Sequence, residues 1–139
     1  IQSISDQTVV FTDGSSTKYD VIIAATGYKI DFPFFSANFI NWQDTDHIPL
    51  YLRVFHPDHP SLFFIGLIQP QGCLWTLAEM QSRLVAQLLA SKTRLPADWR
   101  YKAVIKGTDW MKRFINRPRH LLEVQYFPYL RQLLKLIRQ

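Results

Sequence analysis

Two glutamines flank a proline at Gln69-Pro70-Gln71, and their amides could bind the polar edge of a heterocycle. A side-chain amide both donates and accepts hydrogen bonds without carrying charge, which suits such an edge. Thr26-Gly27 is the second candidate, because a small polar residue followed by glycine lets the backbone approach a ligand closely. Both patterns also occur in exposed loops and strand-ending turns. The residues alone leave that alternative open.

A reactive thiol and a pair of histidines have the residue types for catalysis or metal binding, but their surroundings favour structural roles. Cys73 stands in Gln-Gly-Cys-Leu-Trp, which lacks the paired cysteines around a papain-type nucleophile, so we expect a half-buried structural cysteine. His56 and His59 have no further Cys/His pair at ligand spacing, and Pro57 and Pro60 indicate a rigid turn. We therefore predict no metal site and name no catalytic residue.

The glycines and the overall composition narrow the class of protein. None of the five glycines is followed by another two residues later, so the chain lacks a G-x-G-x-x-G phosphate loop. The 139 residues suit about one domain, and 47% hydrophobic residues exclude a disordered segment. No apolar run approaches the ~18–20 residues of a membrane span, and no export signal is visible. We expect a cytoplasmic protein whose chain is longer than the part at hand.

Charge is distributed unevenly along the chain. Residues 1–91 contain four Lys/Arg and eight Asp/Glu, whereas residues 92–139 contain twelve Lys/Arg and three Asp/Glu. This split indicates a core followed by a basic appendage. The appendage is either a solvated helical face or a surface for an anionic partner such as a phosphate-bearing cofactor or a lipid surface. No nucleic-acid-binding motif is present, so we expect no nucleic-acid partner.

Two apolar runs predict buried strands, and the candidate ligand-binding residues follow shortly after each of them in the sequence. An N-terminal β-hairpin is expected, with one arm at residues 8–11 and the other at residues 19–25. Residues 21–25 are apolar without alternation, which is typical of a parallel strand covered on both faces. Residues 62–65 form a similar run that ends at Gly66. Ligands in α/β proteins bind at the carboxyl ends of such strands.

Apolar residues recur with helical spacing in the segment after residue 76 and again near the end of the chain. Thr76 and Glu79 have the spacing of a capping box, which predicts that a helix begins at Thr76. Its expected apolar stripe is Leu77, Met80, Leu84, Val85, Leu88 and Leu89. The aromatic segment 32–35 contains Pro33 and is expected to be a loop anchored to a core. A short helix at residues 109–114 and a last helix with Pro128 in its first turn complete the prediction; the stripe of the last helix is Tyr126, Leu130, Leu133, Leu134 and Ile137.

Several of these segments, taken in order, resemble one family. Asp20 to Tyr28, with the sequence DVIIAATGY, and the following Phe32-Pro33-Phe34 resemble the Ala-Thr-Gly motif region of flavin-containing monooxygenases. Residues 51–55 and 59–66 fit the stretch that follows in that family. Residues 66–72 and 78–83 look like its late flavin-domain segment. The resemblance covers residues 8–91 well and the basic segment loosely.

The resemblance implies an α/β fold that is the carboxyl-terminal part of a flavoprotein with two dinucleotide-binding domains. Residues 1–25 are then the end of the NADPH domain and its return strand, residues 26–91 the last part of the FAD domain, and residues 92–139 a basic helical extension. FAD and NADPH are the implied cofactors, and Thr26, Gly27, Gln69 and Gln71 the implied cofactor-binding residues. In the family, a C4a-hydroperoxyflavin formed with O2 oxygenates a soft nitrogen or sulfur nucleophile, and the flavin carries the chemistry.

Other functions remain open at this stage. A Baeyer–Villiger or N-hydroxylating relative uses the same flavin chemistry on other substrates. A non-catalytic α/β module, whose basic tail binds a partner or a membrane surface, belongs to a different class. The chain lacks both glycine-rich fingerprints of the family, so we expect the fragment alone to be inactive. The sequence identifies neither the substrate nor the oligomeric state.

Overall fold

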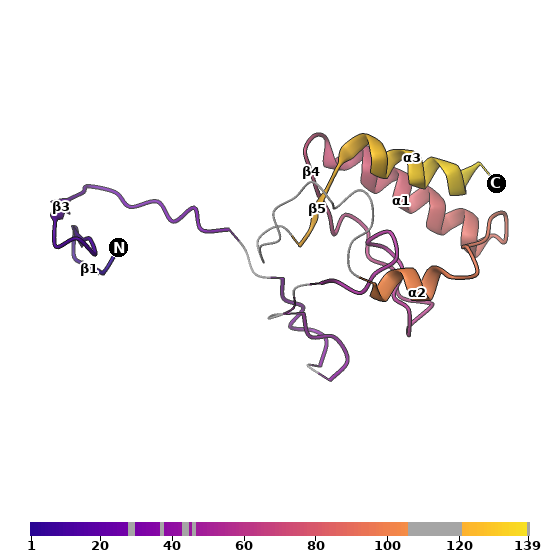
Figure 1. Cartoon of the computed structure of the whole chain (residues 1–139), viewed down its shortest axis with the longest axis horizontal. Coiled ribbons are helices and arrows are strands. Elements are labelled where there is room, and N and C mark those ends of the chain that lie inside the picture. Colours follow the sequence, from indigo (N-terminus) through magenta and orange to yellow (C-terminus); the bar gives the residue numbers. More distant parts are fainter. Residues whose placement is uncertain (28–29, 37, 43–44, 46, 106–120, 139) are drawn as a thin grey trace.

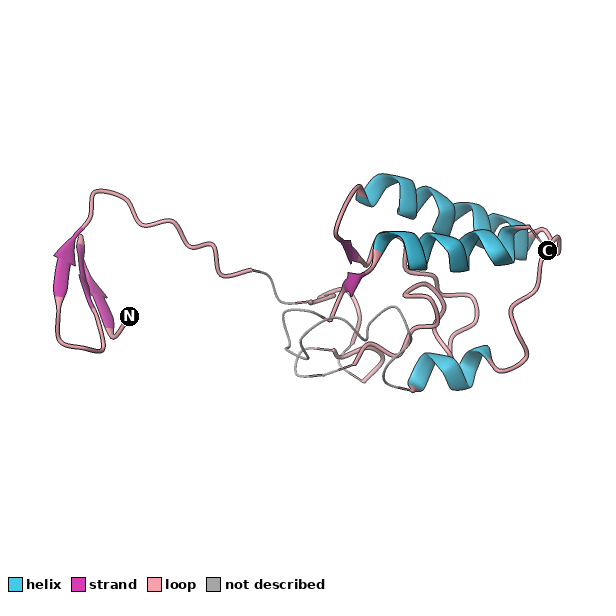
Figure 2. Ribbon diagram, turned by 45° about the horizontal axis from the view of Figure 1, so that its top comes forward, coloured by secondary structure: helices cyan, strands magenta, loops and turns pink. Residues whose placement is uncertain are grey.

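The computed structural model describes residues 1–27, 30–36, 38–42, 45, 47–105 and 121–138. Figure 1 shows a small N-terminal sheet joined to a helical body by one extended segment. In the body, the helices α1 (Leu74–Leu89) and α3 (Tyr126–Ile137) lie side by side, and the shorter α2 (Trp99–Val104) lies apart from them. Figure 2 shows the same separation between the sheet and the helices. Strands and helices are both present, consistent with the predicted α/β class.

The N-terminal sheet has three short antiparallel strands rather than the two arms that were predicted. The strands are β1 (Ser3–Ser5), β2 (Thr8–Val10) and β3 (Ser16–Lys18), in the order β1-β2-β3. Asp13 stabilises the turn between β2 and β3. Asp13 Oδ1 accepts hydrogen bonds from the Ser15 N–H at 2.9 Å and from its hydroxyl at 2.7 Å, and these bonds lower the pKa of the Asp13 carboxyl. An Asx-type turn of this kind is a common way to join two strands.

The predicted buried strand at residues 21–25 does not form. Residues 19–27 connect β3 to the body as an extended segment, and Val21 and Ile23 are 73% and 84% exposed. A β-strand satisfies its backbone amides only when a neighbouring strand pairs with it, and no strand among the described residues does so here. The prediction of a buried strand at residues 21–25 is therefore wrong.

Helix α1 begins two residues before the predicted start. Its N-cap is Cys73, so Thr76 lies within the helix and the predicted capping box with Glu79 does not form. Glu79 instead pairs with Arg83, one turn later, at 2.6 Å. Most of the predicted apolar stripe is confirmed, because Leu77 and Leu84 are buried and Met80, Val85 and Leu88 pack against the core. Leu89 is the exception and is 68% exposed.

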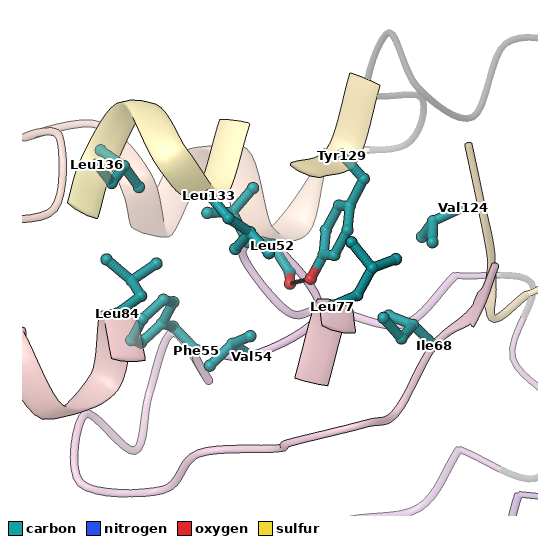
Figure 3. Close-up of a cluster of buried hydrophobic side chains, with 10 residues drawn as sticks. All are labelled: Leu52, Val54, Phe55, Ile68, Leu77, Leu84, Val124, Tyr129, Leu133 and Leu136. Carbon is teal, nitrogen blue, oxygen red and sulfur yellow. Dashed lines mark hydrogen bonds between the residues drawn. The ribbon is translucent and has the colours of Figure 1, made fainter. Parts of the chain in front are cut away.

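The main hydrophobic core lies between α1, α3 and the segment around residues 52–55 (Figure 3). The last helix was correctly predicted, with Pro128 in its first turn, where its missing N–H has no helical partner to lose. Its buried face is shifted from the predicted stripe: Leu133 is buried as expected, but Tyr129 and Leu136 join it. The ten buried residues of this cluster are Leu52, Val54, Phe55, Ile68, Leu77, Leu84, Val124, Tyr129, Leu133 and Leu136.

A chain of three hydrogen bonds, two of them buried, crosses this core and joins four segments. The Gly66 N–H donates to Gln81 Oε1 at 2.8 Å, Gln81 Nε2 donates to the Tyr129 hydroxyl at 2.6 Å, and that hydroxyl donates to the Leu52 carbonyl at 2.5 Å. Burial raises the pKa of the Tyr129 hydroxyl, which therefore stays protonated and able to donate. Figure 3 shows Tyr129 reaching from α3 toward Leu52.

A second cluster packs the irregular segment between residues 30 and 50. Its buried members are Ile40, Trp42, Ile48, Leu50, Phe64 and Leu121. Phe32 and Phe35 pack against it, and the Phe32 ring lies 5.7 Å from Trp42 and 5.6 Å from Phe64. The prediction of an anchored aromatic loop is confirmed for these two rings, whereas Phe34 is exposed.

The second predicted strand, residues 62–65, is also wrong. Phe63 forms only an isolated antiparallel bridge with Phe55, which in turn bridges Tyr51. A tight turn at Leu52 and Arg53, both with positive φ, reverses the chain between Tyr51 and Phe55. Arg53 is buried, where Nη1 donates to the Ile48 carbonyl at 3.2 Å and desolvation lowers its pKa to about 10. The apolar run at 62–65 thus packs into loops and not into a sheet.

In the carboxyl-terminal third, α2 and α3 are described, and the helix predicted at residues 109–114 lies outside the described residues. Two basic side chains of α2 have partners. Lys102 forms an ion pair with Asp98 at 2.9 Å, and the Arg100 guanidinium lies 4.6 Å from the centre of the Trp99 ring. Within the described part of the chain, no helix is long and apolar enough to cross a bilayer.

The predicted turn at residues 56–60 forms around an imidazole acceptor. His56 is buried, and its Nδ1 accepts hydrogen bonds from the backbone N–H of Asp58 at 3.2 Å and of His59 at 3.3 Å. Desolvation by burial lowers the pKa of His56, and the neighbouring His59 ring lowers it further, while Asp58 raises it. A protonated Nδ1 could not accept these two bonds, so the turn requires neutral His56.

We expect this turn to make the protein less stable in mild acid. Because folding lowers the pKa of His56, the unfolded chain binds a proton more readily, so the free energy of unfolding falls as the pH drops below about 6.5, the unperturbed His value. Urea unfolding at several pH values from 8 to 5 measures this fall. His56→Asn keeps an acceptor near the same place but does not titrate, so its profile should be flatter. Identical slopes in both proteins would contradict the assignment to His56.

Candidate functional site

Gln69 and Gln71 lie on a bend held by a two-stranded parallel pairing. The strand β4 (Gln69–Pro70) pairs with β5 (Glu123–Val124), with Gln69 opposite Glu123. The Gln69 N–H donates to the Leu122 carbonyl at 2.7 Å. Pro70 has no N–H to donate, which limits the pairing to these few residues. The bend therefore follows directly from contacts with the carboxyl-terminal segment, 53 or more residues further along the chain.

Next to this pairing, the surface has an open hollow of about 800 Å³. Its lining comes from the bend and from the start of α3: Gln71, Gly72, Cys73, Gln125, Tyr126, Phe127, Pro128 and Arg131. Two side-chain amides, aromatic rings and one guanidinium thus face a single concave surface. Such a lining can contact the face of a flat ring and hydrogen-bond its polar edge.

Gly72 lies against the Tyr126 ring of α3. Its φ of +146° lies in a region that other residues rarely adopt, and a Cβ at this position would lie 3.1 Å from Tyr126 Cδ2. Glycine therefore lets the bend pack directly against the Tyr126 ring.

Cys73 is exposed, so the prediction of a half-buried cysteine is wrong. It lies at the N-cap of α1, where the backbone N–H of Thr76 and then its hydroxyl lower the pKa of the thiol. A nucleophilic cysteine also needs a base, and no histidine is among the residues that line the hollow.

Of the four predicted cofactor-binding residues, Thr26 and Gly27 lie away from the hollow. Thr26 and Gly27 are exposed on the extended segment and are not among the residues that line the hollow. Gly27 has a φ of +84°, so the chain does turn there in the way that favours glycine. Gln69 is exposed on β4, and Gln71 alone of the four lines the hollow.

Sequence reasoning missed the side of the hollow formed by Gln125, Tyr126 and Arg131. The sequence pattern predicts only a basic helical extension here, with Tyr126 on its apolar stripe, because nothing local indicates that β5 pairs with β4. The one available signal was Pro128, which correctly placed the first turn of α3 next to an amide and two aromatic residues.

The histidines border a second, more polar hollow of about 650 Å³, together with Asp58 and Trp42. The rings of His56 and His59 lie 4.7 Å apart, and His47 Nε2 is 2.9 Å from the Ala103 carbonyl. Across the described residues, no group of three or more His, Cys, Asp or Glu side chains is arranged to hold a metal ion.

Comparison with known proteins defines the class. Residues 1–139 match the family described as flavin-binding monooxygenase-like, so the chain belongs to this family of flavoprotein oxidoreductases, as its resemblance predicted. Flavin-containing monooxygenase 5 of Rattus norvegicus is 31% identical over 99% of the chain, and the 4-hydroxybenzoate brominase (decarboxylating) of Marinomonas mediterranea is 33% identical over the same share. Dimethylaniline monooxygenase [N-oxide-forming] 2 of Rattus norvegicus is 31% identical over 96%. The chain spans 26% of the length of each of these relatives.

The family implies FAD with NADPH as reductant, and the hollow can be tested against the flavin ring. The three fused rings of a flavin need a flat contact surface and groups that both donate and accept along their polar edge. Tyr126 provides an aromatic surface, and Gln71 and Gln125 provide amides. The chain has no G-x-G-x-x-G loop for the phosphates. Its residues therefore fit one side of the ring and not the dinucleotide tail.

Proposed function

We propose that this chain is part of a longer NADPH- and FAD-dependent monooxygenase that transfers one oxygen atom of O2 to a nucleophilic nitrogen or sulfur of a small molecule and releases the other as water. The observation that carries this proposal is the family match along all of residues 1–139. Two relatives named as flavin-containing or N-oxide-forming monooxygenases support it. Bound flavin would supply the redox chemistry, taking two electrons from NADPH and reacting with O2.

In this proposal the chain's own residues bind and shield one side of the flavin ring. The Gln71 amide hydrogen-bonds the polar edge of the ring, and Gln69 supports the same bend. Tyr126 covers a face and keeps bulk water away from it, which a reactive oxygen-transferring site requires. Thr26-Gly27 is proposed to approach the cofactor in the longer protein.

The test uses the longer protein that carries this chain. Purified protein should carry one flavin per polypeptide, seen by its visible absorbance, and should consume NADPH and O2 together when a tertiary amine or a thioether is added. Mass spectrometry should show one added oxygen atom in the product. Purification without flavin, or NADPH use that no nitrogen or sulfur substrate stimulates, would argue against the proposal.

We expect that the isolated chain does not bind flavin in stoichiometric amount and does not oxidise NADPH. Its sequence has no G-x-G-x-x-G phosphate loop, and we expect the hollow to contact only one side of the ring, which is too little to retain a dinucleotide. Absorbance of the purified 139-residue chain after dialysis against FAD measures this directly. A chain that stays yellow with one flavin per polypeptide would show that the phosphate contacts are not needed.

A second candidate reaction is halogenation of an aromatic ring. The 33% identity to a 4-hydroxybenzoate brominase (decarboxylating) favours this candidate, because that relative matches as well as the monooxygenases do. Adding bromide and 4-hydroxybenzoate to the longer protein with NADPH separates the two. Brominated product without N- or S-oxide would favour halogenation.

A further inference from the structure

We propose that Tyr126 is a positioning residue that sets the direction in which Gln71 presents its amide to the hollow. This inference deepens the proposed function and rests on it for the nature of the ligand. The contact between the ring of Tyr126 and the bend does not depend on any ligand. It can therefore be tested separately.

The bend has only a short backbone anchor. β4 pairs with β5 over two residue pairs, Gln69 with Glu123 and Pro70 with Val124, and the Gln69 N–H donates to the Leu122 carbonyl. Gln71 lies one residue beyond this pairing and is exposed. Its direction therefore depends on what holds the next residue, Gly72.

Gly72 is held by the Tyr126 ring. A Cβ at Gly72 would lie 3.1, 3.6 and 3.7 Å from Cδ2, Cγ and Cε2 of Tyr126, so one face or edge of the ring lies directly against this backbone. Glycine at φ +146° is what allows so close an approach. The ring thus limits the positions that the backbone after Gln71 can take.

Tyr126 itself is fixed. It is the first residue of α3, it is half-buried, and it packs against the main core, whose members from the same helix include the fully buried Tyr129 and Leu133. The packing of α3 on α1 therefore fixes the Tyr126 ring, and the ring in turn limits the position of the bend. Gln71 and Tyr126 both line the hollow, so the contact between Tyr126 and Gly72 affects the shape of the site next to Gln71.

The first experiment uses this chain, labelled with ¹⁵N, and needs no flavin. Tyr126→Ala should shift the amide resonances of Gln71 and Gly72 and should make hydrogen exchange of the Gln69 amide about tenfold faster, because the bend loses its support. Tyr126→Phe keeps the ring and should restore both to the original values. Leu130→Ala is the matched control, since Leu130 packs against the same core from the same helix but does not line the hollow. It should lower stability without shifting the Gln71 and Gly72 resonances.

The second experiment uses the longer protein. With Tyr126→Ala, the dissociation constant for flavin should rise about tenfold, and in a Gln71→Ala background the same substitution should raise it clearly less, because part of the effect acts through the Gln71 amide. If Tyr126→Ala and Leu130→Ala give the same resonances and exchange rates in the bend, the inference is overturned whatever the ligand. If the longer protein binds no flavin while the bend still shifts in Tyr126→Ala, the proposed function fails and the positioning contact stands.

Discussion

Leu133→Ala is expected to lower the free energy of unfolding by about 3–4 kcal/mol, the usual cost of removing a large apolar side chain from a packed core. Leu133 is fully buried between α3 and α1, in contact with the cluster that includes Leu77 and Leu84. Alanine in its place leaves a cavity that closes only if the two helices shift toward each other, which their other core contacts oppose. Chemical unfolding followed by circular dichroism measures the loss.

The neighbouring position is the control for this prediction. Leu134 is on the same turn of α3 but is only half-buried and is not a member of the core cluster. Leu134→Ala should therefore cost about 1 kcal/mol or less. Equal losses at both positions would mean that α3 does not pack through the face that Leu133 occupies.

Gln81→Leu is expected to cost about 2–4 kcal/mol, although leucine has a similar volume and is more apolar. Gln81 is completely buried, accepts a hydrogen bond from the Gly66 N–H and donates one to the Tyr129 hydroxyl. Leucine removes the acceptor of the half-buried Gly66 N–H and the donor that the buried Tyr129 hydroxyl accepts from, and lost hydrogen bonds in a dry core are costly. Urea unfolding gives the difference in stability.

A double-mutant cycle with Tyr129→Phe identifies the coupling. Tyr129→Phe removes the hydroxyl that links Gln81 to the Leu52 carbonyl, so it should also destabilise on its own. If the hydrogen-bond chain acts as one unit, the double variant should lose clearly less than the sum of the two single losses. Additive losses would show that the two bonds contribute independently.

The helices could be predicted from the sequence because their signals are local. The period of apolar residues in α1, and Pro128 before the apolar residues of α3, indicate helices regardless of the rest of the fold. Their ends and buried faces differ from the prediction, because Gln81 and Tyr129 are buried through hydrogen bonds to each other and to Gly66, which lies far away in the chain. Tertiary hydrogen bonds of this kind leave no periodic signal.

The strands could not be predicted because a strand depends on its partner. Residues 21–25 and 62–65 have the composition of buried strands, yet one is extended and exposed and the other is packed in loops. Conversely, β4 contains a proline and pairs with a segment that had been assigned to a helical tail. For the candidate site, the resemblance predicted the family correctly and Gln71 lines a hollow, whereas the roles of Thr26, Gly27 and Gln69 stay predictions.

The pairing of β4 with β5 has a consequence for the order of events during translation. A ribosome adds about 5–20 residues per second and holds the newest part of the chain in its tunnel, so the bend at residues 69–72 emerges seconds before its partner. Until residues 121–137 have followed, α1 has no helix to cover its apolar face and the bend has no second wall. A pause in synthesis within that interval prolongs the exposure of these surfaces to chaperones and proteases.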